Sequence, residues 1–510
     1  MAGAIVIAAS AATGVGATAT AIVIVAGCAT AIPTVPGRRE GSGHPADPRR
    51  TVNQPHRLTT LASGVRIVTE AMPSVRSVSL GLWMGTGSRH ESDAEAGLSH
   101  LLEHLLFKGT ARYESLQIDQ IFDGMGAELN AGTGKETTSV YARVIDQHLA
   151  DAFDVMADMV FRPALKEIDS EREVILEEIA MYEDEPQEKV FDVLGEAVFG
   201  SDPLGRAIIG RAEVISRTPA AEIARFHRER YRPDNVVIAA AGAVDHDQLV
   251  ALARERVAEG GTTAGTAAAQ AGASRAPTAG GAGAGEALAA EPRVRFERKD
   301  TEQYHVCLGG AGISRHDERR FALRVLDTIF GGTSSSRLFQ EVRERRGLAY
   351  SVYSFTSAYA DTGQVGLYLG TRADNLAAAM AVVGAELARM REEPATPDEL
   401  ARAKENLKGR VVLALESTGA RMNRLGSELL AGSPLLELDE VVERIEAVTL
   451  ADLRELTGEL WAPEGLSAAG IGPDESRFDA ALRGVVGVVG GASGAALPAV
   501  GGTSRTELRA

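Results

Sequence analysis

Cysteine is scarce in this chain of 510 residues, which contains only Cys28 and Cys307. The two lie far apart and form no C-x-x-C spacing, which argues against a disulfide framework and against a thiolate metal site. Any metal ion must therefore be held by histidine and carboxylate side chains.

An excess of basic residues is also missing. The chain has 53 lysines and arginines against 70 aspartates and glutamates, which gives a formal net charge of −17. Nucleic acids and anionic membrane surfaces bind basic patches, and the charges here are scattered rather than grouped. We therefore expect neither nucleic acid nor an anionic membrane surface as a partner.

Charged side chains are absent from residues 1–36, where Ala, Gly, Val, Ile and Thr dominate. The segment is long enough to cross a bilayer, but its hydrophobicity is modest and the basic start of a secretory signal is missing. This favours a disordered extension and a cytoplasmic protein. The alternative is a membrane anchor or export signal, with Cys28 of "VAGC" as an acylated lipoprotein N-terminus. Residues 1–57 are thus predicted to be a disordered or targeting extension.

Changes in composition divide the rest of the chain. The Gly/Ala-rich stretch 260–291 holds almost no large apolar side chain and predicts a flexible linker. It separates an N-terminal domain (58–259) from a C-terminal domain (292–483), and the low-complexity residues 484–510 predict a disordered tail. Strand-like segments in pairs and helical segments in blocks predict an α+β fold for each domain.

The two domains resemble each other. "GLSHLLEHLLFKGT", residues 97–110, matches "ALRVLDTIFGGT", residues 322–333, with Phe107 opposite Phe330. In this register the second domain has Leu323, Leu326 and Asp327 where the first has His100, Glu103 and His104. The match predicts two homologous domains, of which the C-terminal one is inactive.

The first of these segments, residues 97–110, contains the candidate metal-binding and catalytic residues. On an α-helix His100 and His104 lie one turn apart on the same face, so both rings can reach one metal ion. Glu103 borders the same site and suits a base that acts on metal-activated water. The order H-x-x-E-H is the inverted zincin motif.

The alternative interpretation is a helix with two core histidines near a carboxylate. A chain with ten histidines contains this pattern by chance on the order of once in a hundred. Burial of three ionisable groups without a metal would also cost free energy. The pattern therefore favours a metal site.

A catalytic zinc ion usually has three protein ligands, and the third is expected within "DSEREVILEEIAMYEDEP", residues 169–186. The helical pattern there gives an apolar stripe of Val174, Ile175 and Ile179. Glu178 and Glu171 fall along one edge of this stripe. Glu178 is the predicted third ligand. Glu171 is predicted to orient a histidine or the Glu103 region without binding the metal itself.

With "EEIAMYEDEP" about seventy residues after the histidines, and "SSRLFQEVRERRGLAYSVYS" at 335–354, the chain resembles the pitrilysin family. It is most similar to the two-domain branch that contains mitochondrial processing peptidases and their bacterial relatives, over about residues 58–480. The resemblance implies two mixed β-sheets, each with helices packed mainly on one face, and paired halves that close around a chamber. It also implies one Zn²⁺ per chain, bound by His100, His104 and Glu178.

Further roles come from the resemblance alone. It implies that Arg343 and Tyr350 bind substrate and help to stabilise the oxyanion, and that Asn130 and Ala131 begin an edge strand to which a peptide adds. In four-domain relatives the Arg–Tyr pair and the zinc site lie in different domains at the two ends of the chain. A homodimer would bring the two together here, and a heterodimer with a homologue lacking the zinc motif is the alternative.

The sequence thus predicts a zinc-dependent endopeptidase that cleaves short or unfolded peptides, with Glu103 as general base. The alternative is a catalytically silent structural or peptide-binding subunit of a larger complex, as found among family members that have lost the motif. The first domain here keeps His100, Glu103, His104 and Glu178, which favours the enzyme.

Overall fold

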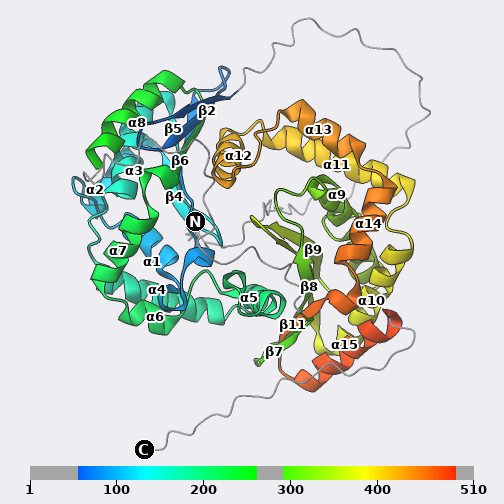
Figure 1. Ribbon diagram of the computed structural model, residues 1–510. Coiled ribbons are helices and arrows are strands. Elements are labelled where there is room, and N and C mark those ends of the chain that lie inside the picture. Colours follow the sequence, from blue (N-terminus) through cyan, green and yellow to red (C-terminus); the bar gives the residue numbers. More distant parts are fainter. Residues whose placement is uncertain (1–55, 261–290, 490–510) are drawn as a thin grey trace, which may run out of the picture.

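The computed structural model describes residues 56–260 and 291–489 (Figure 1). Most of the predicted N-terminal extension, almost all of the predicted linker, and the tail from residue 490 lie outside the described residues. Two halves of similar construction remain, and each is built around one β-sheet. None of the described helices combines the length and the hydropathy that a membrane crossing requires.

The N-terminal half contains a six-stranded sheet with the order β1-β2-β6-β3-β5-β4. Strands β2 and β6 run parallel, and the other neighbours are antiparallel, so the sheet is mixed. The strands are β1 (Arg57–Thr60), β2 (Arg66–Ala71), β3 (Ser77–Met84), β4 (Glu128–Thr133), β5 (Thr138–Ile145) and β6 (Val236–Gly242). Strand β4 lies at one edge of this sheet, which matters for the site below.

Helices of the same half cover one face of this sheet. Because side chains alternate along a strand, Val78, Leu80 and Leu82 of β3 all point into the core beneath these helices. The helices are α1 (Leu98–Leu106), α2 (Ser115–Met125), α3 (Leu149–Phe161), α4 (Ile168–Glu183), α5 (Pro186–Phe199), α6 (Ala212–Arg217), α7 (Ala220–Arg230) and α8 (His246–Gly260). Helix α5 does not cover this sheet, because it packs on the sheet of the C-terminal half.

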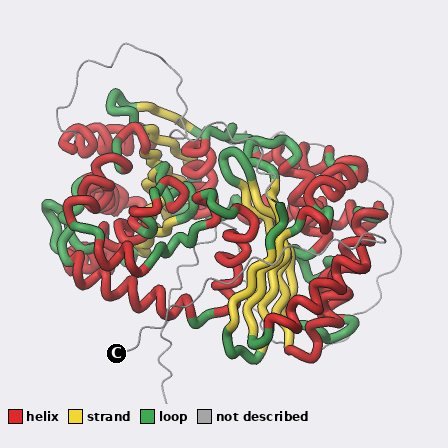
Figure 2. Tube along the Cα trace, turned by 60° about the horizontal axis from the view of Figure 1, so that its bottom comes forward, coloured by secondary structure: helices red, strands yellow, loops and turns green. Residues whose placement is uncertain are grey.

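The C-terminal half contains a five-stranded mixed sheet with the order β7-β11-β8-β10-β9. Figure 2 shows its strands side by side with a layer of helices against them. The strands are β7 (Val294–Arg298), β8 (Gln303–Gly312), β9 (Ser351–Ala358), β10 (Gly363–Arg372) and β11 (Ser467–Gly472). The helices are α9 (Arg320–Phe330), α10 (Leu376–Glu392), α11 (Pro397–Ala414), α12 (Thr418–Ala431), α13 (Leu438–Ala447), α14 (Leu450–Leu460) and α15 (Glu475–Val489).

The two halves exchange one helix each. Helix α5 packs on the C-terminal sheet, where its Leu194 joins a cluster with Cys307 and Ile471. Helix α12 packs on the N-terminal sheet, where Leu425 joins Val237. Figure 1 shows α12 beside β6 and α5 beside β8 and β11. Each sheet thus buries its second face under a helix of the other half, which ties the halves together.

The predicted fold class is confirmed: the chain forms two α+β domains with mixed sheets and helices mainly on one face. One boundary was wrong. Helix α15 continues to Val489, although residues from 484 were predicted to belong to a disordered tail. The reason is packing. Val485 is buried, and its Cα is so close to Gly384 of α10 that a Cβ added to this glycine would lie 3.1 Å from it.

Candidate metal centre and active site

Helix α1 carries the H-x-x-E-H motif and is fixed at its start by a carboxylate. The Glu91 side chain accepts hydrogen bonds from the backbone N–H groups of Gly97 and Ser99 at 2.8 and 2.7 Å, which satisfies donors that a helix start leaves free. Gly97 has a φ of 99°, a left-handed conformation that favours glycine. The apolar side of the helix is buried in the core, and this leaves the His100 and His104 rings edge to face, 4.7 Å apart.

Helix α4 places a carboxylate against both rings. Glu178 Oε2 lies 3.7 Å from His100 Nε2 and 3.5 Å from His104 Nε2. Ligands held about 2.0–2.1 Å from a tetrahedral zinc ion are about 3.3 Å apart, so the three donor atoms are spaced to share one ion. Among the described residues, these three form the group of potential ligands whose atoms all lie within 4.8 Å of one another.

Burial keeps His100 in the neutral state that suits a metal ion. Burial, with a smaller contribution from the neighbouring charge of His104, lowers the pKa of His100 to about 3, so the His100 ring is neutral. A neutral imidazole is the form that binds metal. Burial also raises the pKa of Glu178, against the opposing charge of His104. His100 Nδ1 is buried and has no hydrogen-bond partner among the described residues, whereas Nε2 faces Glu178.

Glu171 lies on the side of His104 that faces away from Glu178. Its Oε2 is 3.4 Å from His104 Nδ1, and its Oε1 is 2.7 Å from Lys108 Nζ. A partner on the far ring nitrogen fixes the orientation of a metal-binding histidine. With Glu171 against Nδ1, the Nε2 atom of His104 faces Glu178. Sequence reasoning missed Lys108, which lies four residues after His104, just beyond the end of α1 at Leu106.

Glu103 is held by a residue that the sequence interpretation also missed. The hydroxyl of Thr133, at the end of β4, donates a hydrogen bond to Glu103 Oε2, and both side chains are buried. Burial raises the pKa of Glu103, while the Thr133 hydrogen bond and the His104 charge oppose this rise. The signal was present in "NAGT", because alternation along a strand puts Thr133 on the same inward face as Ala131.

Asn130 and Ala131, the predicted substrate-binding residues, lie in β4. This strand pairs with β5 on one side and ends the sheet order on the other. The backbone N–H of Ala131 donates to Oδ1 of Asn130 at 2.8 Å. The open edge of β4 thus runs beside the Glu103 site, where an extended peptide can pair with it.

One residue on α4 was wrongly assigned to the apolar stripe. Val174 was predicted to be buried with Ile175, but its exposed fraction is 49% whereas that of Ile175 is 0%. Four residues before Glu178, Val174 lies on the same face of α4 as Glu178, and this part of the face is not covered by neighbouring elements. The neighbouring side chains of Glu173 and Glu177 are exposed.

Arg343 and Tyr350 lie in the C-terminal half, between α9 and β9. Arg343 Nη1 donates to the Tyr350 carbonyl oxygen at 3.0 Å, and the guanidinium also lies over the Phe339 ring. The ion pairs, ring contacts and hydrogen bonds seen for Arg343 all involve residues of this half in the described chain. The structure therefore does not bring this pair into contact with the residues of the metal centre.

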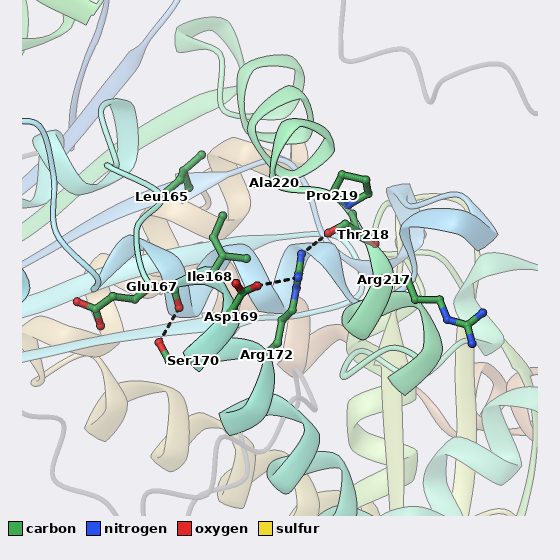
Figure 3. Close-up of a pocket in the computed structure, with 10 residues that line it drawn as sticks. All are labelled: Leu165, Glu167, Ile168, Asp169, Ser170, Arg172, Arg217, Thr218, Pro219 and Ala220. Carbon is green, nitrogen blue, oxygen red and sulfur yellow. Dashed lines mark hydrogen bonds and ion pairs between the residues drawn. The ribbon is translucent and has the colours of Figure 1, made fainter.

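A separate cavity of about 500 Å³ opens at the start of α4, against the turn between α6 and α7 (Figure 3). Leu165 and Glu167 on its wall have φ values of 49° and 58°, which are uncommon for residues other than glycine. Arg172 crosses it and donates to Asp169 and to the Thr218 carbonyl oxygen. Its lining contains none of the predicted site residues, so this cavity is not part of the metal centre.

Family models match both halves of the chain. Residues 66–212 match the model described as "Insulinase (Peptidase family M16)", and residues 219–407 match "Peptidase M16 inactive domain". The first match spans the whole H-x-x-E-H motif and Glu178. The second covers the end of the N-terminal half and much of the C-terminal half.

Curated relatives carry the same kind of description. The chain is 45% identical to an uncharacterized zinc protease from Streptomyces coelicolor, over 78% of this chain and 85% of that protein. It is 41% identical to an uncharacterized zinc protease from Mycobacterium tuberculosis, over 87% of this chain and 99% of the relative. The relative from Bacillus subtilis, also an uncharacterized zinc protease, is 39% identical over 79% of this chain and 95% of its own length.

Solved structures share the fold. A crystal structure of a protease from Helicobacter pylori superposes with a TM-score of 0.74 at 21% identity, covering 82% of this chain and 99% of the other. A peptidase M16 inactive domain from Pseudomonas fluorescens superposes with a TM-score of 0.72 at 22% identity, covering 82% of this chain and 98% of the other. At this level of identity the likeness concerns the fold alone.

Proposed function

Because the chain belongs to the pitrilysin family of zinc proteases, peptidase family M16, we propose that it is a zinc-dependent endopeptidase acting on short or unfolded peptides. The observation that carries this proposal is the convergence of two imidazole nitrogens on one Glu178 oxygen, at 3.7 and 3.5 Å. A buried carboxylate, Glu103, borders the same site.

The proposed metal complement is one Zn²⁺ per chain, held by His100, His104 and Glu178. The donor set of two imidazoles and a carboxylate is typical of catalytic zinc sites. When bound, zinc supplies a Lewis acid and lowers the pKa of a water molecule toward 7.

Glu103 is the proposed general base. Its carboxylate takes the proton of the attacking water and then delivers this proton to the departing amine. The Thr133 hydroxyl holds Oε2 and leaves the other oxygen to carry the proton. Burial raises the pKa of Glu103, which increases its affinity for the proton that it must hold between the two transfers.

Substrate binding is proposed at the open edge of β4, where Asn130 and Ala131 lie. A peptide that pairs with this edge must be extended, which explains the restriction to short or unfolded chains. To bind, it must compete with the Asn130 side chain for the N–H of Ala131. Arg343 and Tyr350 are proposed to hold the peptide and the developing oxyanion.

The location of the Arg–Tyr pair supports a dimer. Because its contacts stay within the C-terminal half, we propose that Arg343 and Tyr350 of one protomer complete the metal site of its partner. A homodimer supplies two such composite sites. A heterodimer with a homologue that lacks the zinc motif would supply one, and it is the alternative assembly.

A second candidate function is a catalytically silent structural or peptide-binding subunit. The match of residues 219–407 to a domain described as inactive favours it. The geometry of His100, His104 and Glu178 in the first domain favours the enzyme instead. The C-terminal half then serves as the non-catalytic copy that supplies Arg343 and Tyr350.

A fluorogenic-peptide assay with chelation and zinc add-back tests the proposed function. We expect the metal-free protein to be inactive and zinc to restore cleavage. Glu103→Gln should retain zinc but lose activity by about 10²–10⁴-fold, and His104→Ala should lose both zinc and activity. Cleavage at the wild-type rate by Glu103→Gln would refute the proposed mechanism, and zinc binding without cleavage by the wild type would favour the silent subunit.

A further inference from the structure

A cluster of charged side chains joins the two halves at the turn between β4 and β5. Glu136 Oε1 accepts a hydrogen bond from Arg89 Nη1 at 2.7 Å, and Oε2 accepts one from Arg315. Oε1 also accepts the backbone N–H of Ala360 at 3.1 Å. Only 11% of the Glu136 side chain is exposed, so three donors surround a carboxylate that is almost removed from water.

Two of these three donors belong to the other half of the molecule. Arg315 follows β8, and Ala360 lies in the turn between β9 and β10. Arg89 strengthens the same junction, because its Nη2 binds Asp361 of that turn at 2.5 Å. Charge-assisted hydrogen bonds in a desolvated setting are strong and directional, so the β4–β5 turn is anchored to the C-terminal half.

The anchored turn leads directly to the site. Three residues before Glu136, Thr133 ends β4 and donates its hydroxyl to Glu103. Within the sheet β4 pairs with β5 alone, because it lies at the edge, and its inner side packs on α1 and α2. The turn adds support at the Thr133 end of β4, because the N–H groups of Ser88 and Arg89 bind the Gly134 and Lys135 carbonyl oxygens at 3.2 and 2.8 Å. The position of Thr133 therefore depends on how the turn is held.

We infer that Glu136 is a positioning residue: by anchoring the β4–β5 turn to the C-terminal half, it holds the substrate-binding edge and, through Thr133, the carboxylate of Glu103. This inference rests on the proposed function for its catalytic consequence but not for the anchoring itself. Separation of the halves at this junction would release Thr133 from Glu103. Catalysis is thereby coupled to the contact between two domains, although Glu136 touches neither the metal ligands nor Glu103 itself.

The chain offers a matched control. Glu70 on β2 is also a carboxylate at the junction of the two halves, with 9% of its side chain exposed. It accepts hydrogen bonds from Arg421 and Arg424 of α12. Strand β2 lies near the opposite edge of the sheet from β4. Loss of the Glu70 charge should loosen the junction without acting on the β4–β5 turn.

Hydrogen–deuterium exchange of the metal-free, full-length protein tests the anchoring. In Glu136→Gln we expect the amides of residues 128–133 to exchange at least tenfold faster than in the wild type, and in Glu70→Gln we expect no change there. Arg315→Met, which removes the guanidinium from the other half, should reproduce the Glu136→Gln result. Unchanged exchange in both Glu136→Gln and Arg315→Met, or an equal increase in Glu70→Gln, would overturn the inference.

Kinetics of the zinc-loaded protein test the path through Thr133. We expect Glu136→Gln to lower kcat about tenfold with KM changed less than threefold and zinc content unchanged. Residues that act through one another give non-additive effects, so Glu136→Gln should lower kcat little further in a protein that already carries Thr133→Val. In a protein that carries Thr133→Ser, which keeps a hydroxyl, Glu136→Gln should again lower kcat about tenfold.

Additive losses in the double variant, or an equal loss of kcat in Glu70→Gln, would refute the positioning role. A wild-type protein without peptidase activity would refute the proposed function and the catalytic consequence together. The hydrogen–deuterium exchange measurement alone would then decide whether Glu136 anchors β4.

Discussion

The guanidinium carbon of Arg343 lies 4.4 Å from the centre of the Tyr350 ring. This cation–π contact and the hydrogen bond to the Tyr350 carbonyl oxygen hold both side chains in one arrangement. Yet 71% of Tyr350 is exposed, which is unusual for a large aromatic residue that is held in place. A guanidinium that is one-quarter exposed and packs against an exposed phenol is suited to bind a group supplied by another molecule.

A mixed dimer tests whether this pair acts across protomers. One protomer carries Glu103→Gln and the other carries Arg343→Ala, and the two are separated from homodimers by different affinity tags. If sites are composite, one of the two sites combines an intact Glu103 with an intact Arg343. We expect about half of the wild-type activity, whereas both variant homodimers are nearly inactive.

The mixed dimer should behave differently if each site is formed within one protomer. If each protomer uses its own Arg343, neither site of the mixed dimer is complete, and its activity should not exceed that of the variant homodimers. A monomeric wild-type protein with full activity would also contradict the composite site.

Glu171→Gln tests the support behind the metal centre. Loss of the charge weakens the contacts that orient His104 and pair with Lys108. Loss of such an outer partner typically weakens metal affinity by about 10–100-fold, and we expect this range in competition titrations with a chromophoric chelator. Glu173→Gln, at an exposed position of the same helix, is the control, and equal affinities of the two variants would count against the orienting role.

Gly426→Ala tests the exchange of helices between the halves. A Cβ at Gly426 of α12 would lie 2.2 Å from Trp83 Nε1 of β3, so the helix must shift from the sheet. Overpacking of this kind costs about 1–3 kcal/mol, measured as a decrease in the free energy of unfolding. Gly409→Ala on α11 is the matched control, because nothing lies within 4 Å of its Cβ. There we expect a stabilisation of about 0.5–1 kcal/mol, and equal effects at both positions would argue against tight docking of α12.

The Glu399–Arg337 pair predicts a pH dependence of stability. Burial alone would raise the pKa of Glu399, but hydrogen bonds from Arg337 and from Thr396 outweigh it and lower the pKa from 4.5 to about 2. Because the folded-state value lies below the unfolded one, the stabilisation is present above pH 4.5 and is lost as the pH falls toward 2. After allowance for solvent screening we expect about 1–2 kcal/mol.

Glu399→Gln isolates this charge, because glutamine can still accept the capping hydrogen bond from the Thr396 N–H. The difference in unfolding free energy between wild type and variant should be largest above pH 5 and should shrink as the pH approaches 2.5. Glu416→Gln, at an exposed position, should show no such trend. A difference that does not depend on pH would contradict the assignment.

The sequence sufficed for those parts of the site that depend on helical spacing. His100 and His104 are four residues apart, and Glu171 and Glu178 are seven apart, so each pair shares one helix face whatever the rest of the fold does. The exposure of Val174 was missed because periodicity defines a stripe but not the width over which a neighbouring helix covers it.

Contacts between distant segments could not be derived from spacing. The Thr133–Glu103 hydrogen bond depends on how the β4–β5 hairpin packs against α1, and the surroundings of Glu136 depend on the docking of two halves. The exchange of α5 and α12 is of the same kind. Each helix has an apolar face, but nothing local indicates that the face is covered by the other domain's sheet.

The central claim is that His100, His104 and Glu178 bind one zinc ion, and metal analysis of two neighbouring variants tests it most directly. Glu178→Ala removes a predicted ligand, whereas Glu177→Ala removes an exposed carboxylate from the same turn of α4. Elemental analysis after equilibration with limiting zinc should find about one zinc per chain in the wild type and in Glu177→Ala, and far less in Glu178→Ala. Equal zinc in all three proteins would contradict the account.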